Sequence, residues 1–314
     1  MSEAIRSHAP RFLVLRGGAI GDFIATLPVL QALRAQWPDV QIEIWGYPHI
    51  AELAVATGLA QSVVSLDRAE MSRFFVPEPS FTDAQVAAVR SFDLVFNYLH
   101  DPVGQVRSNL LLAGAKQVLS GSPIIKRGHA VSFLLEPLQA LAIYETEIAP
   151  ALDFPAELRE RGRERLRALG LKGKPVAVHP GSGSPLKNWP IERYVEIIRR
   201  LRGKGLEAVG IIGEADAAEA AVLAREFPDL ALLSGLTLVE LGAVLAECRL
   251  YLGNDSGITH LAAAAGLPVV ALFGPSDADQ WGPRGRGRVR ILRAPEGELE
   301  RLPVSAVWEA LENP

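Results

Sequence analysis

The chain has 314 residues, of which 49% are hydrophobic and 22% are charged, and its net charge at pH 7 is −4. This composition excludes a largely disordered protein, and the negative charge excludes a general attraction to nucleic acid, so any polyanion would be bound locally. Cys248 is the single cysteine, which excludes an intrachain disulfide and a cysteine-based metal site and is typical of a cytoplasmic protein.

Short apolar runs alternate with amphipathic stretches from Arg11 onward, which is the pattern of βα units that form parallel sheets. The residues before Arg11 lack the apolar core of a signal peptide, and the longest apolar run, residues 261–274, is interrupted by glycine and proline, so we expect no membrane span. In the first half we predict strands at 11–16, 40–46, 62–66, 92–98 and 116–121, and helices at 22–36, 48–57, 82–90, 103–113 and 127–143.

Periodicity is lost around residues 148–156, which contain two prolines and precede a charged helix over 156–170. We therefore predict an α/β fold of two Rossmann-like domains, residues 1–150 and 151–314, with a closing helix at 303–313 that packs on either one. In the second half we predict strands at 174–181, 205–213, 229–235, 248–255 and 267–274, and helices at 190–203, 215–226, 237–246 and 257–265.

The stretch RGGAIGD, residues 16–22, lies where the first strand gives way to a helix, as a dinucleotide-binding fingerprint would. The fingerprint fails because its first glycine position holds Arg16 and because Asp22 would put a negative charge beside the pyrophosphate. A carboxylate at a helix N-terminus is instead stabilised by the helix dipole, by about 0.3–1 kcal/mol. Asp22 is therefore either a helix cap or a base that accepts a proton, and this motif alone leaves both open.

Two loops of the second half have groups that suit phosphate oxygens. In residues 176–190 a strand ends in a glycine–serine loop, and Lys187 follows, so that backbone N–H groups, hydroxyls and an ammonium lie close together. In residues 251–268 a strand ends at Asn254 and Asp255, and Ser256-Gly257 opens a helix whose free N–H groups can bind a diphosphate. The structural alternatives are a plain turn for the first loop and a buried histidine for His260 in the second.

Two further patterns are weaker. Asp277-Ala278-Asp279 has the spacing of a metal-binding D-x-D, but its loop with Pro275 and Ser276 favours a turn. Five arginines lie in residues 282–293, where a solvated strand and loop is favoured over contact with an anionic acceptor.

The segments RGGAIGDFIATLP, HPGSGSPLKNWP and GNDSGITHLAAAAGLPVVALFGPSD, in this order and spacing, resemble glycosyltransferase family 9, the ADP-heptose:lipopolysaccharide heptosyltransferases. The resemblance covers about residues 11–285, and His129, at the start of a helix, is a further match. It implies a GT-B fold, with two Rossmann-like domains facing across a cleft, the acceptor on the first domain and the nucleotide sugar on the second.

By this resemblance Asp22 looks like the catalytic base of an inverting, metal-independent glycosyltransferase. It would move a sugar, heptose by family, from a nucleotide diphosphate, ADP by family, to a hydroxyl of a saccharide or lipopolysaccharide-type acceptor. We assign donor binding to Gly181, Ser182, Lys187, Glu214, Asp255, Ser256, Gly257 and His260. We assign the acceptor side to Gly17, Gly18, Gly21, Asn97, His100 and Asp101.

The expected partners are the sugar nucleotide and a saccharide or glycolipid acceptor, without a metal, a cofactor or nucleic acid. A lipid acceptor would require peripheral contact with the inner face of the cytoplasmic membrane. Residues 1–150 lack the Lys/Arg cluster common in this family, and FNYLHDPVG replaces an Asp-Ala-Gln-Gly type of sequence, which leaves the acceptor open. Two other functions stay open: a sugar-nucleotide epimerase or silent binding protein on the same fold, and an NAD-dependent oxidoreductase, against which Arg16 and Asp22 argue.

Overall fold

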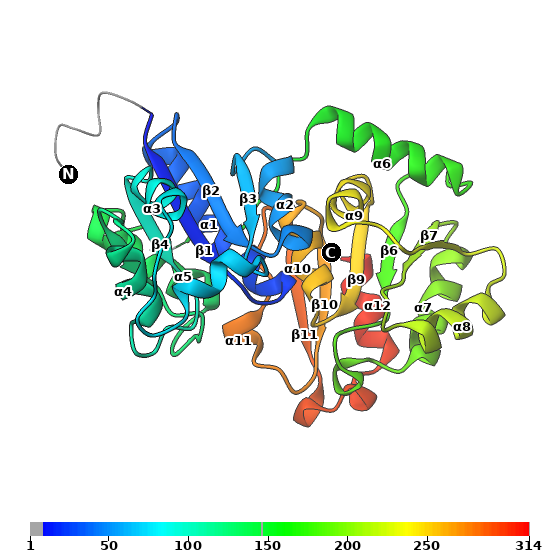
Figure 1. Cartoon of the computed structure of the whole chain (residues 1–314). Coiled ribbons are helices and arrows are strands. Elements are labelled where there is room, and N and C mark those ends of the chain that lie inside the picture. Colours follow the sequence, from blue (N-terminus) through cyan, green and yellow to red (C-terminus); the bar gives the residue numbers. More distant parts are fainter. Residues whose placement is uncertain (1–8, 146, 314) are drawn as a thin grey trace. The chain divides into compact units, whose positions relative to one another are not determined.

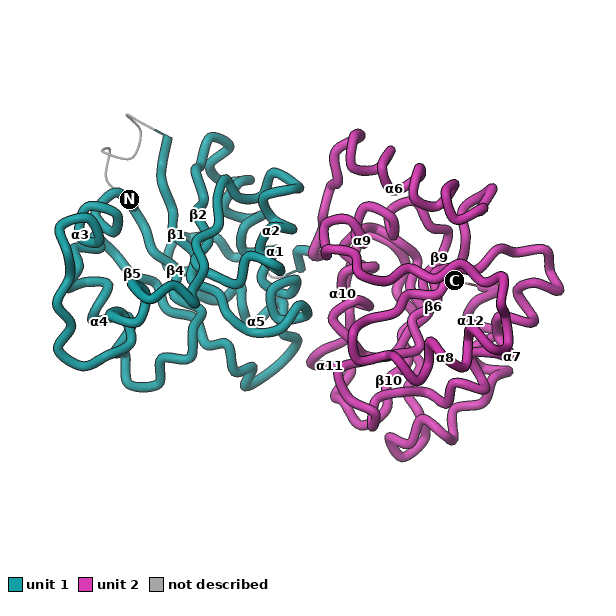
Figure 2. Tube along the Cα trace, turned by 45° about the vertical axis from the view of Figure 1, so that its right-hand side comes forward, with its two compact units in different colours: residues 1–148 teal, residues 149–314 magenta. Residues whose placement is uncertain are grey.

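The computed structural model describes residues 9–145 and 147–313, and the chain divides into two compact units, residues 1–148 and 149–314. Each unit is built around one sheet in which every strand pair is parallel (Figure 1, Figure 2). The predicted α/β class is therefore confirmed for the described residues.

Unit 1 contains a five-stranded parallel sheet. Its strands are β1 (Arg11–Arg16), β2 (Gln41–Gly46), β3 (Ser62–Ser65), β4 (Leu94–Asn97) and β5 (Val118–Ser120). They are ordered β3-β2-β1-β4-β5, so the direction of strand succession reverses between β1 and β4. Ligands of such sheets bind beyond the carboxyl ends of the strands at this reversal. The loops after β1 and β4 are therefore the expected functional edge of unit 1.

The middle strand of unit 1 is apolar because both faces of its sheet are covered. Phe12, Leu13, Val14 and Leu15 of β1 are all at most 1% exposed, as expected for a parallel strand packed on both sides. The helices are α1 (Ile20–Gln36), α2 (Pro48–Ala56), α3 (Asp83–Arg90), α4 (Gln105–Leu112) and α5 (Ala130–Leu135), with 3₁₀ segments η2 (Ala69–Phe74) and η3 (Glu136–Leu141).

The predicted single helix over 127–143 is wrong. The structure has α5 followed by the 3₁₀ turns of η3, and Pro137 lies at the start of η3. Proline has no N–H to donate, and its ring clashes with the preceding turn, so an α-helix does not continue through this position without a break. His129 is the N-cap of α5, where its Nδ1 accepts a hydrogen bond of 3.2 Å from the N–H of Val131.

Unit 2 contains a six-stranded parallel sheet. Its strands are β6 (Val176–His179), β7 (Ala208–Ile211), β8 (Ala231–Leu233), β9 (Leu250–Asn254), β10 (Val269–Phe273) and β11 (Val289–Arg293). They are ordered β11-β10-β9-β6-β7-β8, so the reversal lies between β6 and β9. The two phosphate-binding loops predicted from the sequence follow these two strands, and they therefore emerge side by side.

The helices of unit 2 cover its sheet, and the closing helix belongs to this unit. The helices are α6 (Ala156–Ala168), α7 (Ile191–Gly203), α8 (Ala217–Glu226), α9 (Leu238–Leu245), α10 (Gly257–Ala264), α11 (Ala278–Trp281) and α12 (Val304–Glu312), with 3₁₀ turns η4 (Pro185–Lys187), η5 (Pro295–Gly297) and η6 (Leu299–Arg301). Val307 and Ala310 of α12 share a hydrophobic cluster with α7 and β10. Of the two predicted positions for the closing helix, the structure gives the one on the second domain.

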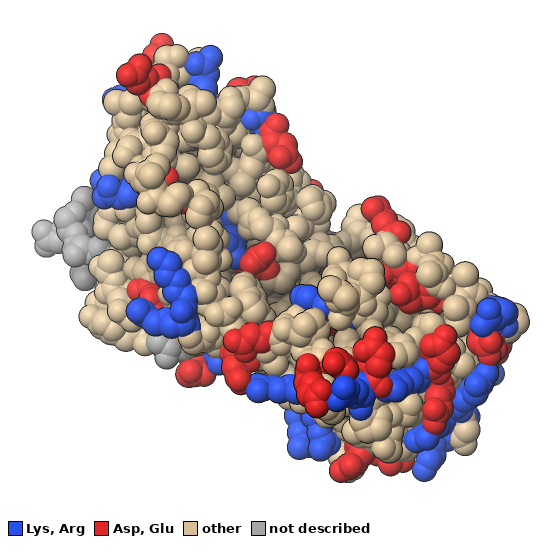
Figure 3. Space-filling model, turned by 90° about the horizontal axis from the view of Figure 1, so that it is seen from below, with Lys and Arg blue, Asp and Glu red and all other residues tan. Residues whose placement is uncertain are grey.

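One face of the molecule shows how charged side chains are distributed. On the face drawn in Figure 3, Lys and Arg side chains are interleaved with Asp and Glu side chains, and neither sign forms a broad patch. In the described part of the chain, no helix combines the length and the apolar character that a bilayer crossing requires.

Candidate functional site

Asp22 lies in the first turn of α1, directly after the loop that follows β1. The N-cap is Ala19, so the alternative in which Asp22 itself is the N-cap is wrong. Asp22 is the third residue of the helix, and its Oδ2 accepts a hydrogen bond of 2.9 Å from the N–H of Ala19. This is half of a capping box, because the methyl group of Ala19 cannot return a bond. The Asp22 side chain is 28% exposed, so one carboxylate is both anchored and accessible to a ligand.

Arg16 fixes the other side of this carboxylate. Its guanidinium donates to the carbonyl of Asp22 at 2.9 Å and lies 3.4 Å from Asp22 Oδ1, with only 1% of its side chain exposed. Burial lowers the pKa of Arg16, and the neighbouring carboxylate of Asp22 opposes that shift. The same guanidinium lies 3.4 Å from the carbonyl of Tyr98, directly after β4. Arg16 therefore joins the two loops at the strand-order reversal of unit 1.

One of the glycines before Asp22 makes room for its carboxylate. Gly18 has a φ of +94°, which disfavours other residues, and a Cβ there would lie 2.9 Å from Asp22 Oδ2. A Cβ at Gly17 would make only ordinary contacts, the nearest at 3.5 Å from Leu99. Gly21 is the second residue of α1. Gly18 is thus the glycine on which the position of the carboxylate depends.

The predicted acceptor-side residues after β4 have structural partners. Asp101 accepts from the N–H groups of Val106 and Arg107 at 3.0 and 2.9 Å, and so caps the start of α4. Asn97 is fully buried and donates to Asp101 Oδ2 at 3.2 Å. His100, between them, is exposed. Of these three residues, His100 is the one that faces solvent, while Asn97 and Asp101 shape the loop.

The two predicted phosphate-binding loops of unit 2 are joined by an ion pair. Lys187 Nζ lies 2.7 Å from Asp255 Oδ2, with 38% and 9% of the two side chains exposed. Lys187 ends η4 after β6, and Asp255 follows β9, so residues 68 positions apart meet at the strand-order reversal. Ser182 does not point away from its loop, because its Oγ donates to the carbonyl of Ser184 at 2.7 Å.

Ser256 is the N-cap of α10, and its Oγ accepts from the N–H of Thr259 at 3.3 Å. The N–H groups of Gly257 and the residue after it belong to the first turn, which has no acceptors within the helix and can bind an anion. His260, one turn further in, is 9% exposed. Glu214 lies in the loop after β7 and is exposed.

Four buried polar residues around these loops were not among the predicted donor-binding residues, although the sequence pattern places Asn254 at the end of its strand. Asn254 donates to the carbonyl of Pro180 at 2.7 Å and accepts from the N–H of Trp189 at 3.1 Å, so it supports the loop after β6 from both ends. The others are His179, Asp216 and Tyr251, each at most 4% exposed. Their partners are distant in sequence, so periodicity and motif spacing gave no signal for them. Polar residues at the ends of predicted parallel strands, such as His179 and Asn254, were the one available hint.

The two weaker patterns have structural explanations. Asp277 is the N-cap of α11, where its Oδ1 accepts from the N–H of Asp279 at 2.9 Å, and Asp279 pairs with Arg293. The D-x-D sequence is thus a capping turn, as favoured. In the arginine run, Arg286 pairs with Asp153 at 2.5 Å and Arg290 donates to the carbonyl of Asn313 at 3.0 Å. Among the described residues, no group of three or more His, Cys, Asp or Glu side chains could hold a metal ion.

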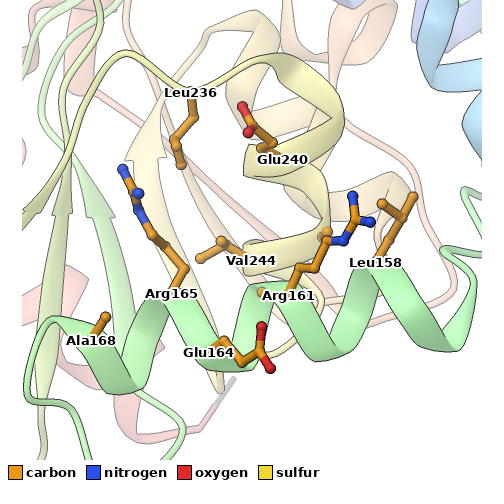
Figure 4. A pocket seen from close by; sticks show the side chains of 10 residues that line it. Leu158, Arg161, Glu164, Arg165, Ala168, Leu236, Glu240 and Val244 are labelled. Atoms are coloured by element: carbon orange, nitrogen blue, oxygen red, sulfur yellow. The ribbon is translucent and has the colours of Figure 1, made fainter.

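A separate cavity of about 370 Å³ lies between α6 and α9 in unit 2 (Figure 4). Apolar side chains of Leu158, Leu236 and Val244 share it with Arg161 and Arg165, as Figure 4 shows. Its lining contains none of the residues predicted for donor or acceptor binding.

Comparisons with known proteins indicate one family. The sequence profile of glycosyltransferase family 9 (heptosyltransferase) matches residues 109–302. Lipopolysaccharide heptosyltransferase 2 of Salmonella typhimurium is 34% identical, over 90% of this chain and 88% of that protein. Lipopolysaccharide heptosyltransferase 3 of Escherichia coli is 23% identical over 90% of this chain and 88% of that protein.

Solved structures share the fold. A glycosyltransferase family 9 protein from Veillonella parvula superposes with a TM-score of 0.79 at 20% identity, covering 97% of this chain and 96% of that one. The E. coli ADP-heptose lps heptosyltransferase II superposes with a TM-score of 0.76 at 20% identity, covering 96% and 98%.

Proposed function

This chain belongs to glycosyltransferase family 9 and is a glycosyltransferase with the GT-B fold, and on that premise we propose that it transfers heptose from ADP-heptose to a hydroxyl of a lipopolysaccharide-type acceptor. The names of the curated relatives support heptose as the sugar and lipopolysaccharide as the acceptor. The match to one of them at 34% identity covers 90% of this chain, so the support does not rest on one motif. We propose that unit 1 receives the acceptor and unit 2 the donor.

The Lys187–Asp255 pair is the observation that carries the donor assignment. It brings an ammonium next to the first turn of α10, at the strand-order reversal of unit 2. A diphosphate there would receive charge-assisted hydrogen bonds from Lys187 and bonds from the backbone N–H groups after Ser256. These groups favour the negative charge that develops on a leaving diphosphate. We therefore propose that departure of the diphosphate is assisted by the protein itself, without a metal ion.

Asp22 is the proposed base. It is a half-buried carboxylate held by Ala19 and Arg16, and it leaves part of its side chain open to solvent. In the proposed step the acceptor hydroxyl attacks the anomeric carbon from the face opposite the diphosphate. Asp22 takes the hydroxyl proton, the new C–O bond forms, and the bond to the diphosphate breaks with its electron pair. One displacement of this kind inverts the anomeric configuration.

Two measurements test the proposal. A thermal-shift panel of ADP-, UDP-, GDP- and dTDP-linked sugars reports donor choice, because a ligand that binds only the folded state raises the melting temperature. Transfer of heptose to lipopolysaccharide from heptose-deficient cells, with and without EDTA, then tests the reaction and the role of metal. The anomeric configuration of the product tests inversion. Donor binding without transfer would instead indicate a silent binding protein on this fold.

An acceptor of this type is anchored in a membrane. The proposal therefore includes peripheral contact with the inner face of the cytoplasmic membrane during the reaction.

A further inference from the structure

A chain of buried polar contacts runs beneath the two donor-binding loops of unit 2. His179, the last residue of β6, places Nε2 3.1 Å from Oδ2 of Asp216 and Nδ1 3.1 Å from the hydroxyl of Tyr251. The Tyr251 hydroxyl lies 3.1 Å from Oγ1 of Thr259, in the first turn of α10. All four side chains belong to residues at most 4% exposed. We call Asp216, His179, Tyr251 and Thr259 the buried polar chain.

One end of the buried polar chain supports the loop after β6. A Cβ at Gly181 would lie 1.8 Å from Asp216 Oδ1, so the carboxylate packs directly against the backbone of Gly181. The other oxygen of Asp216 accepts from the N–H of Gly213 at 2.7 Å, in the loop after β7. Burial favours a raised pKa for Asp216, but the hydrogen bonds from His179 and Gly213 outweigh it and lower the pKa. Asp216 is therefore an ionised acceptor for both neighbours.

The other end supports the start of α10. The Thr259 hydroxyl donates to the carbonyl of Asn254, which uses its single hydrogen. It therefore accepts from the hydroxyl of Ser256, 3.1 Å away, and from that of Tyr251 whenever Tyr251 does not donate to His179. The hydroxyl of Ser256, the N-cap of α10, is thereby bonded to Thr259, the last member of the buried polar chain. The first member, Asp216, lies against Gly181.

Two other connections join the loops: the buried side chain of Asn254, which bonds to Pro180 and Trp189, and the Lys187–Asp255 pair. The Lys187–Asp255 pair is partly exposed on the lysine side, where water and salt screen it. The buried polar chain is removed from water, so its hydrogen bonds are costly to break and hold their geometry. It also crosses from β7 through β6 to β9, which are neighbours in the sheet.

We propose that the buried polar chain sets the position of the Gly181 loop relative to the start of α10, so that both present their N–H groups to the same diphosphate. Asp216, His179, Tyr251 and Thr259 are thus positioning residues that act through Gly181 and Ser256. This inference rests on the proposed function of unit 2 as the donor-binding unit.

The test interrupts the buried polar chain and measures binding of ADP and of adenosine by calorimetry on the full-length protein. Tyr251→Phe and Thr259→Val each remove one hydroxyl with little change of shape. We expect the Kd for ADP to rise about three- to tenfold in both, since at least one buried hydrogen bond is lost, while adenosine binding is unchanged. Thr259→Ser keeps the hydroxyl and is expected to retain wild-type affinity for ADP.

Tyr98→Phe is the matched control, because Tyr98 is a fully buried tyrosine of unit 1 whose hydroxyl donates to the carbonyl of Leu134 at 2.9 Å. It should lower the melting temperature while leaving ADP affinity at the wild-type value. Wild-type affinity for ADP in folded Tyr251→Phe and Thr259→Val would overturn the inference alone. Failure of the wild-type protein to bind ADP would overturn the proposed function together with it.

Discussion

The guanidinium of Arg16 donates to the backbone carbonyl of Asp22 at 2.9 Å and also lies 3.4 Å from its carboxylate, although the two residues belong to different elements. Arg16 ends β1 and is almost fully buried, so it holds the first turn of α1 from beneath. The residue that breaks the dinucleotide fingerprint in the sequence is therefore the one that positions the proposed base. Arg16 cannot replace the first glycine of the dinucleotide fingerprint, which makes a tight turn. Its guanidinium is suited to holding a carboxylate.

Asp22→Asn is expected to lower kcat of heptose transfer about a hundredfold to ten-thousandfold, because the amide cannot take the proton of the acceptor hydroxyl. The amide oxygen can still accept from the N–H of Ala19, so the melting temperature should stay near that of the wild type. Asp93→Asn is the control. Asp93 is a largely buried carboxylate that accepts from the N–H of Arg11, at the opposite end of β1 from Asp22. Equal turnover in Asp22→Asn and wild type would remove Asp22 from the chemistry.

Gly18→Ala is expected to reduce turnover through Asp22. The substitution introduces backbone strain at a φ of +94°, worth about 1–3 kcal/mol, and a Cβ 2.9 Å from Asp22 Oδ2. Gly58→Ala separates the two effects, because Gly58 has a φ of +74° and a Cβ added there would meet nothing within 4 Å. Urea unfolding should show a loss of stability in both variants, whereas kcat should fall only in Gly18→Ala. A comparable fall in kcat for Gly58→Ala would show that strain alone explains the effect.

Lys187→Ala is expected to weaken ADP-heptose binding about tenfold or more, since a charge-assisted bond to the diphosphate is lost. It also leaves Asp255, whose side chain is 9% exposed, without its cation. Lys204→Ala is the control in the same unit, because Lys204 pairs with Glu312 at 3.5 Å on the surface. Calorimetric titration with ADP-heptose measures both variants. If the two lysine variants bind the donor equally well, the diphosphate does not lie at Lys187.

Gly181→Ala and Gly183→Ala should behave differently although both lie in the same loop. A Cβ at Gly181 would overlap Asp216 at 1.8 Å, whereas a Cβ at Gly183 would meet nothing within 4 Å. We expect Gly181→Ala to lose most of its donor affinity because the loop must move, and Gly183→Ala to keep it. Donor titration of both variants checks this. Loss of affinity in both would indicate that the donor itself approaches the backbone closely at Gly183.

Cys248 is expected to be unreactive in the folded protein. Burial raises the pKa of its thiol to about 12, and the neighbouring carboxylate of Glu247 adds to the shift. At pH 8 the thiolate fraction is then about 10⁻⁴, and the thiolate is the reactive form. Ellman's reagent should react with the thiol only after unfolding in denaturant. Reaction of the native protein at the rate of free cysteine would show that the α9–β9 connection opens readily.

Much of the chain's secondary structure could be predicted because it depends on local patterns. The strand RFLVLR, residues 11–16, is an apolar run because β1 is covered on both faces, and the same holds for residues 269–273 of β10. The prediction of one helix over 127–143 failed at Pro137. Proline interrupts an α-helix, and this local rule was available, but the prediction followed the helical pattern of the segment.

Roles that depend on distant partners were not predictable in this way. Asp22 lay in a recognisable motif, yet its bond to Ala19 and its neighbour Arg16 depend on how the loop after β1 turns. His179 and Asp216 are 37 residues apart and gave no pattern, because a hydrogen bond between two loops leaves no periodicity in the sequence.

Residue order alone was enough to predict the α/β class, the alternation of strands and helices, and the family from its three motifs, since these depend on the order and spacing of residues along the chain. Which polar groups are left for a ligand depends on how the chain folds. In each sheet, parallel strands bring loops from distant positions to one edge. At that edge of unit 1, Asp101 caps α4 and Asp22 keeps part of its carboxylate exposed. At that edge of unit 2, Asp255 meets Lys187. The hydrogen-bond partners of these groups depend on which loops meet at the edge of a sheet, and a linear sequence does not show which loops meet.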